Sequence, residues 1–504
     1  MNRKIALLSF LAFALPAGVA AQSSTPDVGT AASAQAPDAK ELQKQLEELR
    51  AQLSKMQTRL DQLQNAKPES ANQSSSTAQP ASTPQEGTIQ STPARPEGST
   101  SAHVGNATKT FETFSEDSVA APRYDNVPLD PKYDGFFFLP GTQTLLKIGG
   151  YFKTDTMFDL KQAGNADEFV TSSIPVPQVP GIKNNNISIR PTRLSLDFRI
   201  PSTKLGEVRF YIEGDFFGTN SNTPRLRHAY AQAGNLLIGQ TFTNFMDPDA
   251  SPDTLDFEGP NGLVYVRSPQ IRFSFAVNHN TTLSISAEKP TSDVAFKTPQ
   301  FTAQPDAPAP DGTVRVRKEF NRGHVQAAAV FRDIAAFLPS GQQGSVFGWG
   351  VNASAFLKTF HQDNLIIEGT FGHGVSRYIQ DTSGLGLDAE VADNANPHLK
   401  ATPAMGAEAA YQHYWTRSLR SNLVYGYAAV QDTRFVQPAG VTFNPFNHSN
   451  YSATNLIWNP YGSLNVGAEF LYGGQVLKNG AFSYAPRIQF SAKYSFVRLH
   501  PDKN

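Results

Sequence analysis

The chain has 504 residues, of which 39% are hydrophobic, and its 43 basic and 44 acidic side chains leave its net charge near zero. A chain without an excess of basic residues is not expected to bind nucleic acid. It has no cysteine, so disulfide bonds, thiolate metal sites and cysteine catalysis are excluded as well.

The N-terminus has the pattern of a secretory signal peptide. Arg3 and Lys4 precede an apolar run that ends at Leu15, and small residues follow before an expected cut ahead of Gln22. The apolar run is too short to cross a membrane as a helix, which disfavours the alternative of an N-terminal anchor. Residues 1–21 are therefore predicted to be removed from an exported protein.

Residues 38–66 are predicted to form a coiled-coil helix. Apolar side chains recur there at alternating spacings of four and three residues, which is the heptad pattern. The seam consists of Leu42, Leu46, Leu49, Leu53, Met56, Leu60 and Leu63. A lone amphipathic helix packed on another domain would show a wider apolar face. The seam therefore favours self-association, and leucine at both core positions leaves two or three strands open.

Residues 67–132 are predicted to form a flexible linker. They are rich in Ser, Thr, Pro, Gln and Ala. Such a segment cannot bury enough apolar surface to offset the entropy lost on ordering. A binding site within the segment is the less favoured alternative.

Residues 133–496 consist of segments in which polar and apolar side chains alternate. In KIGGYFKTDTMFDL (147–160), Lys153 and Asp155 share one face of a strand, and Phe152 and Phe158 share the other. Globular strands usually have about 5 or 6 residues, whereas a strand of about 10 residues crosses a bilayer. The polar face of a soluble sandwich is the alternative explanation for this segment alone.

The order of short and long connections decides between these two folds. Long loops are predicted at 161–186, 289–312, 333–346, 375–400 and 432–449, with short turns between them. A sandwich has no reason to sort its loops in this way, whereas outer-membrane barrels have short turns at one rim and long loops at the other. Sixteen strands are predicted near 145–160, 187–200, 207–217, 224–233, 236–243, 263–277, 282–288, 313–320, 324–332, 347–358, 364–374, 402–413, 421–431, 450–458, 463–472 and 481–496. The predicted fold is thus an all-β transmembrane barrel of sixteen antiparallel strands, with a short tail at 497–504.

Four stretches of the barrel resemble the DcaP-type outer-membrane porins, a group named for dicarboxylic acid uptake. They are FLPGTQTLLKIGGYFKTDTMFD (138–159), LGEVRFYIEGDFFG (205–218), PRLRHAYAQAGNLLIGQTFTNFMD (224–247) and PDTLDFEGPNG (252–262). The resemblance implies a homotrimer of sixteen-stranded barrels in the outer membrane of a Gram-negative bacterium, with a preference for small anionic solutes. It also implies that the seam at 42–63 belongs to a periplasmic helical stalk.

With a periplasmic N-terminus, residues 244–262 form the third external loop, which the resemblance implies folds into the lumen and narrows it. Its acidic residues are Asp247, Asp249, Asp253, Asp256 and Glu258. Basic residues predicted on the facing lumen wall are Lys153, Arg193, Arg199, Arg209, Arg225, Arg227, Arg272, Arg315 and Arg317. Opposed charges of this kind create a transverse field that selects the sign of an ion. The alternatives are that these charges are only hydrated or pair with one another, and that the acidic residues pin the loop to the wall.

We therefore expect a porin that lets small anionic solutes, above all dicarboxylic acids, diffuse passively across the outer membrane. A saccharide-specific or general non-selective porin is the alternative, but sugar channels need a file of aromatic rings. Inward aromatics are few, chiefly Tyr151, Tyr211 and Phe217. The ten histidines are scattered without metal-ligand spacing, so no catalytic residue, metal or cofactor is predicted. A structural role of the stalk, as a tether to the cell wall or to a periplasmic partner, can coexist with transport.

Overall fold

The computed structural model describes residues 135–203, 206–219, 222–294, 304–338, 341–392, 398–431 and 446–495. The predicted signal peptide (1–21), coiled coil (38–66), linker (67–132) and tail (497–504) lie outside the described residues. Within the described part of the chain, no helix is long and apolar enough to span a membrane.

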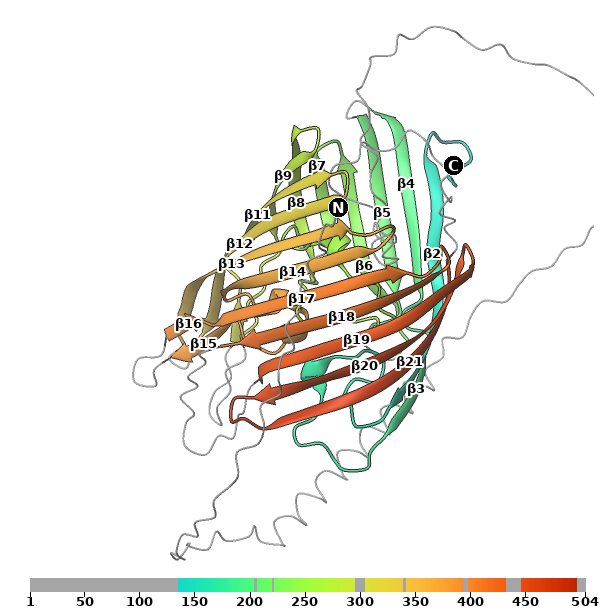
Figure 1. The fold of residues 1–504 in the computed structure, drawn as a ribbon. Coiled ribbons are helices and arrows are strands. Elements are labelled where there is room, and N and C mark those ends of the chain that lie inside the picture. Colours follow the sequence, from blue (N-terminus) through green and yellow to red (C-terminus); the bar gives the residue numbers. More distant parts are fainter. Residues whose placement is uncertain are drawn as a thin grey trace, which may run out of the picture. The chain divides into compact units, whose positions relative to one another are not determined.

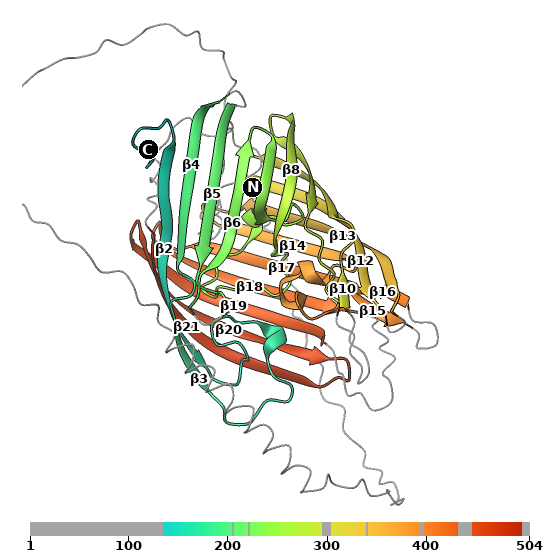
Figure 2. The same ribbon diagram turned by 180° about the vertical axis from the view of Figure 1, so that it is seen from behind.

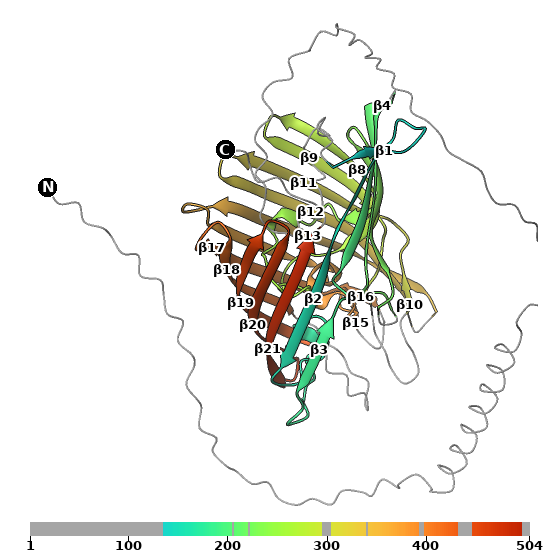
Figure 3. The ribbon, with the colours of Figure 1, turned by 90° about the vertical axis from the view of Figure 1, so that its right-hand side faces the viewer.

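The described residues form a closed antiparallel barrel of sixteen wall strands, as predicted (Figures 1 and 2). The wall strands are β2 (Leu145–Asp159), β4 (Arg193–Thr203), β5 (Gly206–Asp215), β6 (Arg225–Ala233), β7 (Leu236–Phe242), β8 (Arg267–Asn278), β9 (Thr281–Glu288), β11 (Asp311–Phe320), β12 (Gly323–Phe337), β13 (Gln343–Lys358), β14 (Asn364–His373), β17 (Pro403–Tyr414), β18 (Leu419–Val430), β19 (Phe446–Tyr461), β20 (Leu464–Leu477) and β21 (Phe482–Ser495). The ring closes where β21 pairs with β2, with Tyr494 opposite Phe152 (Figure 3).

Several short elements complete the fold. β1 (Phe137–Phe138) and β10 (Gln304–Asp306) extend the sheet beside β2 and β12, and β3 (Asn184–Ser188) pairs with the far half of β2, in line with β4. β15 (Ala389–Ala392) and β16 (His398–Ala401) form a separate hairpin. Four 3₁₀ turns lie in the loops, namely η1 (Thr171–Ser173), η2 (Pro248–Ala250), η3 (Ser376–Tyr378) and η4 (Gln380–Thr382).

Side-chain alternation assigns the two faces of the wall. In β2, Lys153 and Asp155 are buried on the inner side, whereas Phe152 is 58% exposed on the outer side. Leu196 and Phe490 are also exposed, at 36% and 49%. An outer surface of large apolar side chains around a polar interior is the arrangement that a bilayer requires of a barrel.

One predicted loop is wrong: residues 333–346 do not form a long connection. β12 continues to Phe337 and β13 begins at Gln343, so only 338–342 lies between them. The reason is a small apolar cluster at this rim, in which Ile334 packs with residues of β15 and β16. Burial of these side chains extends the two strands beyond the point where their alternation weakens.

Candidate functional site

Loop 3 (243–266) folds into the lumen and is anchored to the wall along its length. Near its start, the Asp247 carboxylate accepts a hydrogen bond of 2.6 Å from Ser354 Oγ on β13. Further along, Asp253 lies 2.6 Å from Nε of Arg420 on β18. Neither β13 nor β18 is next to β7 or β8, the strands that loop 3 connects. These contacts therefore hold the loop inside the ring, as the resemblance implied.

A second set of anchors holds the middle of loop 3. The Glu469 carboxylate on β20 accepts hydrogen bonds from the backbone N–H groups of Leu255 and Asp256, at 2.9 and 2.8 Å. From the other side, Lys153 Nζ donates to the Leu255 carbonyl oxygen at 2.6 Å. Gly262 presses on the wall so closely that a Cβ there would lie 2.3 Å from a carbonyl oxygen of β17. Only glycine permits such an approach of two backbones.

The acidic residues of loop 3 are placed mainly as anchors. Asp247 and Asp249 pair with Arg317 at 3.1 and 2.6 Å, and Asp256 accepts hydrogen bonds from two backbone N–H groups. Burial and nearby carboxylates raise the pKa of Glu258 well above its usual range, which favours its neutral form. The predicted arginines Arg199, Arg209, Arg225 and Arg227 pair with carboxylates of the wall.

Arginines on β4 and β5 are instead held by a carboxylate of their own wall. Arg199 and Arg209 stand opposite each other across the two strands, and both contact Asp197, at 2.9 and 3.0 Å. Asp197 lies in a predicted alternating strand but is not among the predicted site residues. Its spacing of two residues from Arg199, which puts both on one face, was the available signal.

A similar arrangement occurs on β5 and β6. Arg225 and Arg227 both contact Asp215, at 2.7 and 3.0 Å. Arg227 also pairs with Glu213 at 2.9 Å and donates to the Tyr265 hydroxyl at 3.0 Å. These fork-shaped contacts fix both guanidinium groups against the wall.

The remaining predicted arginines are packed into the wall by other contacts. The Arg193 guanidinium lies 5.0 Å from the centre of the Phe257 ring, contributed by loop 3. Arg272 donates to the Phe242 carbonyl oxygen at 2.6 Å, and Arg315 donates to a serine of β9 at 3.1 Å. These three arginines are at most 2% exposed.

Arg267, at the start of β8, is a cation that the sequence analysis missed. Its guanidinium lies 5.3 Å from the centre of the Tyr265 ring and 6.0 Å from that of Phe242. Among the described residues, no carboxylate pairs with it. Alternation along β8 puts Arg267 on the same face as the outward Ile271, so the pattern alone gives no signal for it. The Arg267 guanidinium nevertheless lies over the ring of Tyr265, whose hydroxyl accepts a hydrogen bond from Arg227.

The wall on the other side of the ring carries buried carboxylates. Glu368 on β14 and Glu408 on β17 stand directly opposite each other and are each 4% exposed. Glu368 accepts a hydrogen bond of 2.8 Å from the backbone N–H of Val264 in loop 3. Within the described ranges, no group of three or more His, Cys, Asp or Glu side chains could hold a metal ion.

Two further loops enter the lumen, which the sequence analysis did not anticipate. In loop 6 (374–402), Ile379 forms a β-bridge with Val264 of loop 3. The next carboxylate, Asp381, accepts hydrogen bonds from Thr171 of loop 1 (160–183) and, at 2.6 Å, from Ser449 on β19. Three loops therefore meet inside the ring, and no local sequence pattern marks that meeting.

The number of inward aromatic side chains was underestimated. Loop 3 carries Phe257 into the lumen, where it stacks on Phe217 with ring centres 4.5 Å apart. Phe245 packs edge-on against Tyr378 at 5.4 Å. These rings are at most 8% exposed, so they pack against one another and do not form an open file along the channel.

The comparisons with known proteins agree with this architecture. The DcaP outer membrane protein family matches residues 138–496. Among solved structures, the outer membrane channel DcaP of Acinetobacter baumannii is 23% identical with a TM-score of 0.62, and the match covers 71% of this chain and 99% of that one. An anion-selective porin from Comamonas acidovorans is 10% identical with a TM-score of 0.46, covering 70% of this chain and 100% of that one. No curated protein sequence matches the chain.

Proposed function

Because the chain belongs to the DcaP outer membrane protein family, and is thus a porin of the Gram-negative outer membrane, we propose that it passes small anionic solutes. Dicarboxylic acids are the solute class that we propose. They would move by passive diffusion along the arginines of β4 to β11, past loop 3.

The observation that carries the proposal is Arg267. Most other arginines named above are fixed by carboxylates or deeply packed, so their charge is largely compensated or shielded. Arg267 is partly exposed and is held only by the faces of two aromatic rings. A guanidinium in that setting keeps its charge and its donors, and its planar fork suits a carboxylate.

We also propose that the protein is a homotrimer whose stalk is the coiled coil at 38–66. The heptad seam supports self-association. Under this proposal the acidic residues of loop 3 act mainly by fixing the loop, and the loop sets the width available to the solute.

Reconstitution of the wild-type protein tests the proposed selectivity. In planar bilayers under a KCl gradient, the reversal potential should lie on the chloride side, and succinate should carry current. In liposome swelling, succinate should enter faster than a neutral sugar of similar size. A cation-selective reversal potential, or faster entry of the sugar, would refute the proposal and favour a saccharide-specific or general porin.

A further inference from the structure

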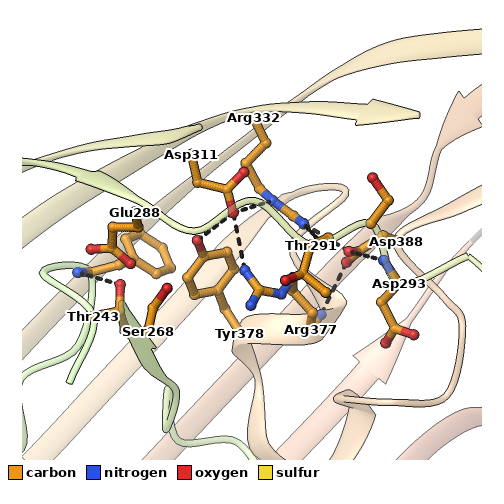
Figure 4. Close-up of polar contacts among 12 residues, drawn as sticks. Thr243, Ser268, Glu288, Thr291, Asp293, Asp311, Arg332, Arg377, Tyr378 and Asp388 are labelled. Carbon is orange, nitrogen blue, oxygen red and sulfur yellow. Dashed lines mark hydrogen bonds and ion pairs between the residues drawn. The ribbon is translucent and has the colours of Figure 1, made fainter. Parts of the chain in front are cut away.

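Arg332 on β12 joins the wall to two external loops. It is 2% exposed. Its guanidinium lies 3.2 Å from Asp311 on β11 and 2.9 Å from Asp388 in loop 6 (Figure 4). It also donates to the carbonyl oxygens of Gly374, at the start of loop 6, and of Thr291 in loop 4 (289–310), the latter at 2.6 Å. One side chain thus fixes both ends of the inward part of loop 6.

The two carboxylates that Arg332 holds are themselves bound to η3. Asp388 accepts hydrogen bonds from Ser376 Oγ and from the Arg377 backbone N–H, both at 3.0 Å. Asp311 accepts from Arg377 Nη1 at 3.0 Å and from the Tyr378 hydroxyl at 2.8 Å (Figure 4). The position of η3 therefore depends on the geometry that Arg332 imposes on these carboxylates.

Beyond η3, loop 6 crosses the interior of the ring. Ile379 bridges to Val264 of loop 3, and both side chains are fully buried. Asp381 then reaches Ser449 on β19. Four strands, β13, β14, β17 and β18, separate β12 from β19 in the ring. Loop 6 therefore crosses the lumen between its anchor at Arg332 on β12 and its anchor at Ser449 on β19.

Besides these contacts with loop 6, loop 3 is held to the wall independently. Its own anchors are Arg317, Arg420 and Glu469, on β11, β18 and β20. Loss of Arg332 is therefore expected to free loop 6 from β12, while the wall anchors keep loop 3 inside the ring.

We propose that Arg332 is a positioning residue for solute passage, because it holds residues 374–388 across the lumen as a second part of the constriction beside loop 3. The inference rests on the porin function of the family and not on the proposed anion preference. A channel that prefers cations would refute that preference and would leave this inference to be decided by conductance.

The test compares the wild type with Arg332→Ala in single-channel recordings in KCl. We expect a larger conductance and frequent steps between sub-levels in the variant, because loop 6 can leave the lumen. A wild-type conductance without such steps would overturn the proposal. If Arg332→Ala does not give a folded barrel, Asp388→Asn serves instead, since it removes the ion pair at the far end of residues 374–388 and leaves Arg332 paired with Asp311.

A cross-link separates positioning from a general loss of stability. Residues paired across an antiparallel bridge have Cα atoms about 4.5–5.5 Å apart, which suits a disulfide, and the chain has no other cysteine. Val264→Cys with Ile379→Cys, added to Arg332→Ala, should restore the wild-type conductance when oxidised and lose it again on reduction. A conductance that stays raised after oxidation would overturn the proposal.

Arg487→Ala is the matched control. Arg487 is equally buried and pairs with Asp159 at 2.6 Å, but its loop contact is with Asn165 of loop 1. Any change in its conductance should persist when the same two cysteines are oxidised. Reversal of that change by the cross-link would show a general stiffening of the barrel and count against a specific role of Arg332.

Discussion

Replacing Arg267 by glutamine removes one charge from the lumen and keeps a polar side chain of similar length. In the wild type, the guanidinium rests on the rings of Tyr265 and Phe242 and pairs with no described carboxylate. Its loss therefore leaves no carboxylate uncompensated. The same change at Arg227 would strand Glu213 and Asp215 and mix two effects.

The size of the effect follows from Coulomb's law. A monovalent anion about 4 Å from the guanidinium gains about 1 kcal/mol if the surroundings screen as water does. Because about 1.4 kcal/mol corresponds to a tenfold ratio, the local anion population should fall roughly fivefold in Arg267→Gln, and the anion-to-cation ratio should fall further because a cation at the same point is no longer repelled. A less polar lumen would make the change larger, and added salt would make it smaller.

The assay is the reversal potential of reconstituted channels under a KCl gradient, converted to a chloride-to-potassium permeability ratio. Arg322→Gln is the control, since this exposed arginine lies in the turn between β11 and β12, where it donates to the Thr359 carbonyl oxygen. It removes the same charge outside the lumen and should leave the ratio nearly unchanged. Equal ratios for Arg267→Gln and the wild type would refute the assignment of anion preference to Arg267.

Three other outcomes follow from the same contacts. Phe152→Arg, on the lipid-facing side, should lower the free energy of unfolding in liposomes by about 2–4 kcal/mol if it lies near the bilayer centre; urea titration measures it, and an unchanged midpoint would contradict the assigned face. Glu469→Ala leaves the buried N–H groups of Leu255 and Asp256 without their acceptor, which costs about 1–3 kcal/mol of stability for each group. The change should loosen loop 3 and raise the single-channel conductance, and an unaltered conductance would contradict this. Burial raises the pKa of Asp381 to about 6, from the usual value of about 3.9. Its protonation therefore supports the folded loop below about pH 4, and that support is lost as the pH rises through 6. Channel fluctuations should thus increase from pH 5 to pH 8 in the wild type but not in Asp381→Asn.

The wall of the barrel could be read from the sequence because its cause is local. Successive side chains of a strand point to opposite faces, one toward lipid and one toward the lumen. The apolar Phe152 and the charged Lys153 therefore already show the two environments in two adjacent residues. The strand count followed from repeating that pattern. The prediction failed at 333–346, where contacts with the β15–β16 hairpin, and not alternation, keep the strands paired.

The interior could be read only in part because its contacts depend on register and on loops. Asp197 is two residues from Arg199 and shares its face, but its contact with Arg209 requires the pairing of β4 with β5. The bridge between Val264 and Ile379 joins loops that are far apart in the chain, and neither residue stands out among other apolar residues. Arg267 shares the parity of the outward Ile271, so alternation alone does not identify it as a lumen cation.

The paired arrangement of the lumen charges changes how an arginine ladder should be understood. The guanidinium nitrogens of Arg209 and Arg227 lie 2.8 and 2.9 Å from carboxylate oxygens. Beyond a few ångströms each ion pair therefore acts as a dipole, and its electric field falls off quickly with distance. On the other side of the ring, loop 3 lies against Glu368 through Val264, which keeps that carboxylate from a passing solute. The count of arginines therefore overstates the field. Under the proposed function, the preference for anions depends on Arg267 and on the loops that cover the opposing carboxylates.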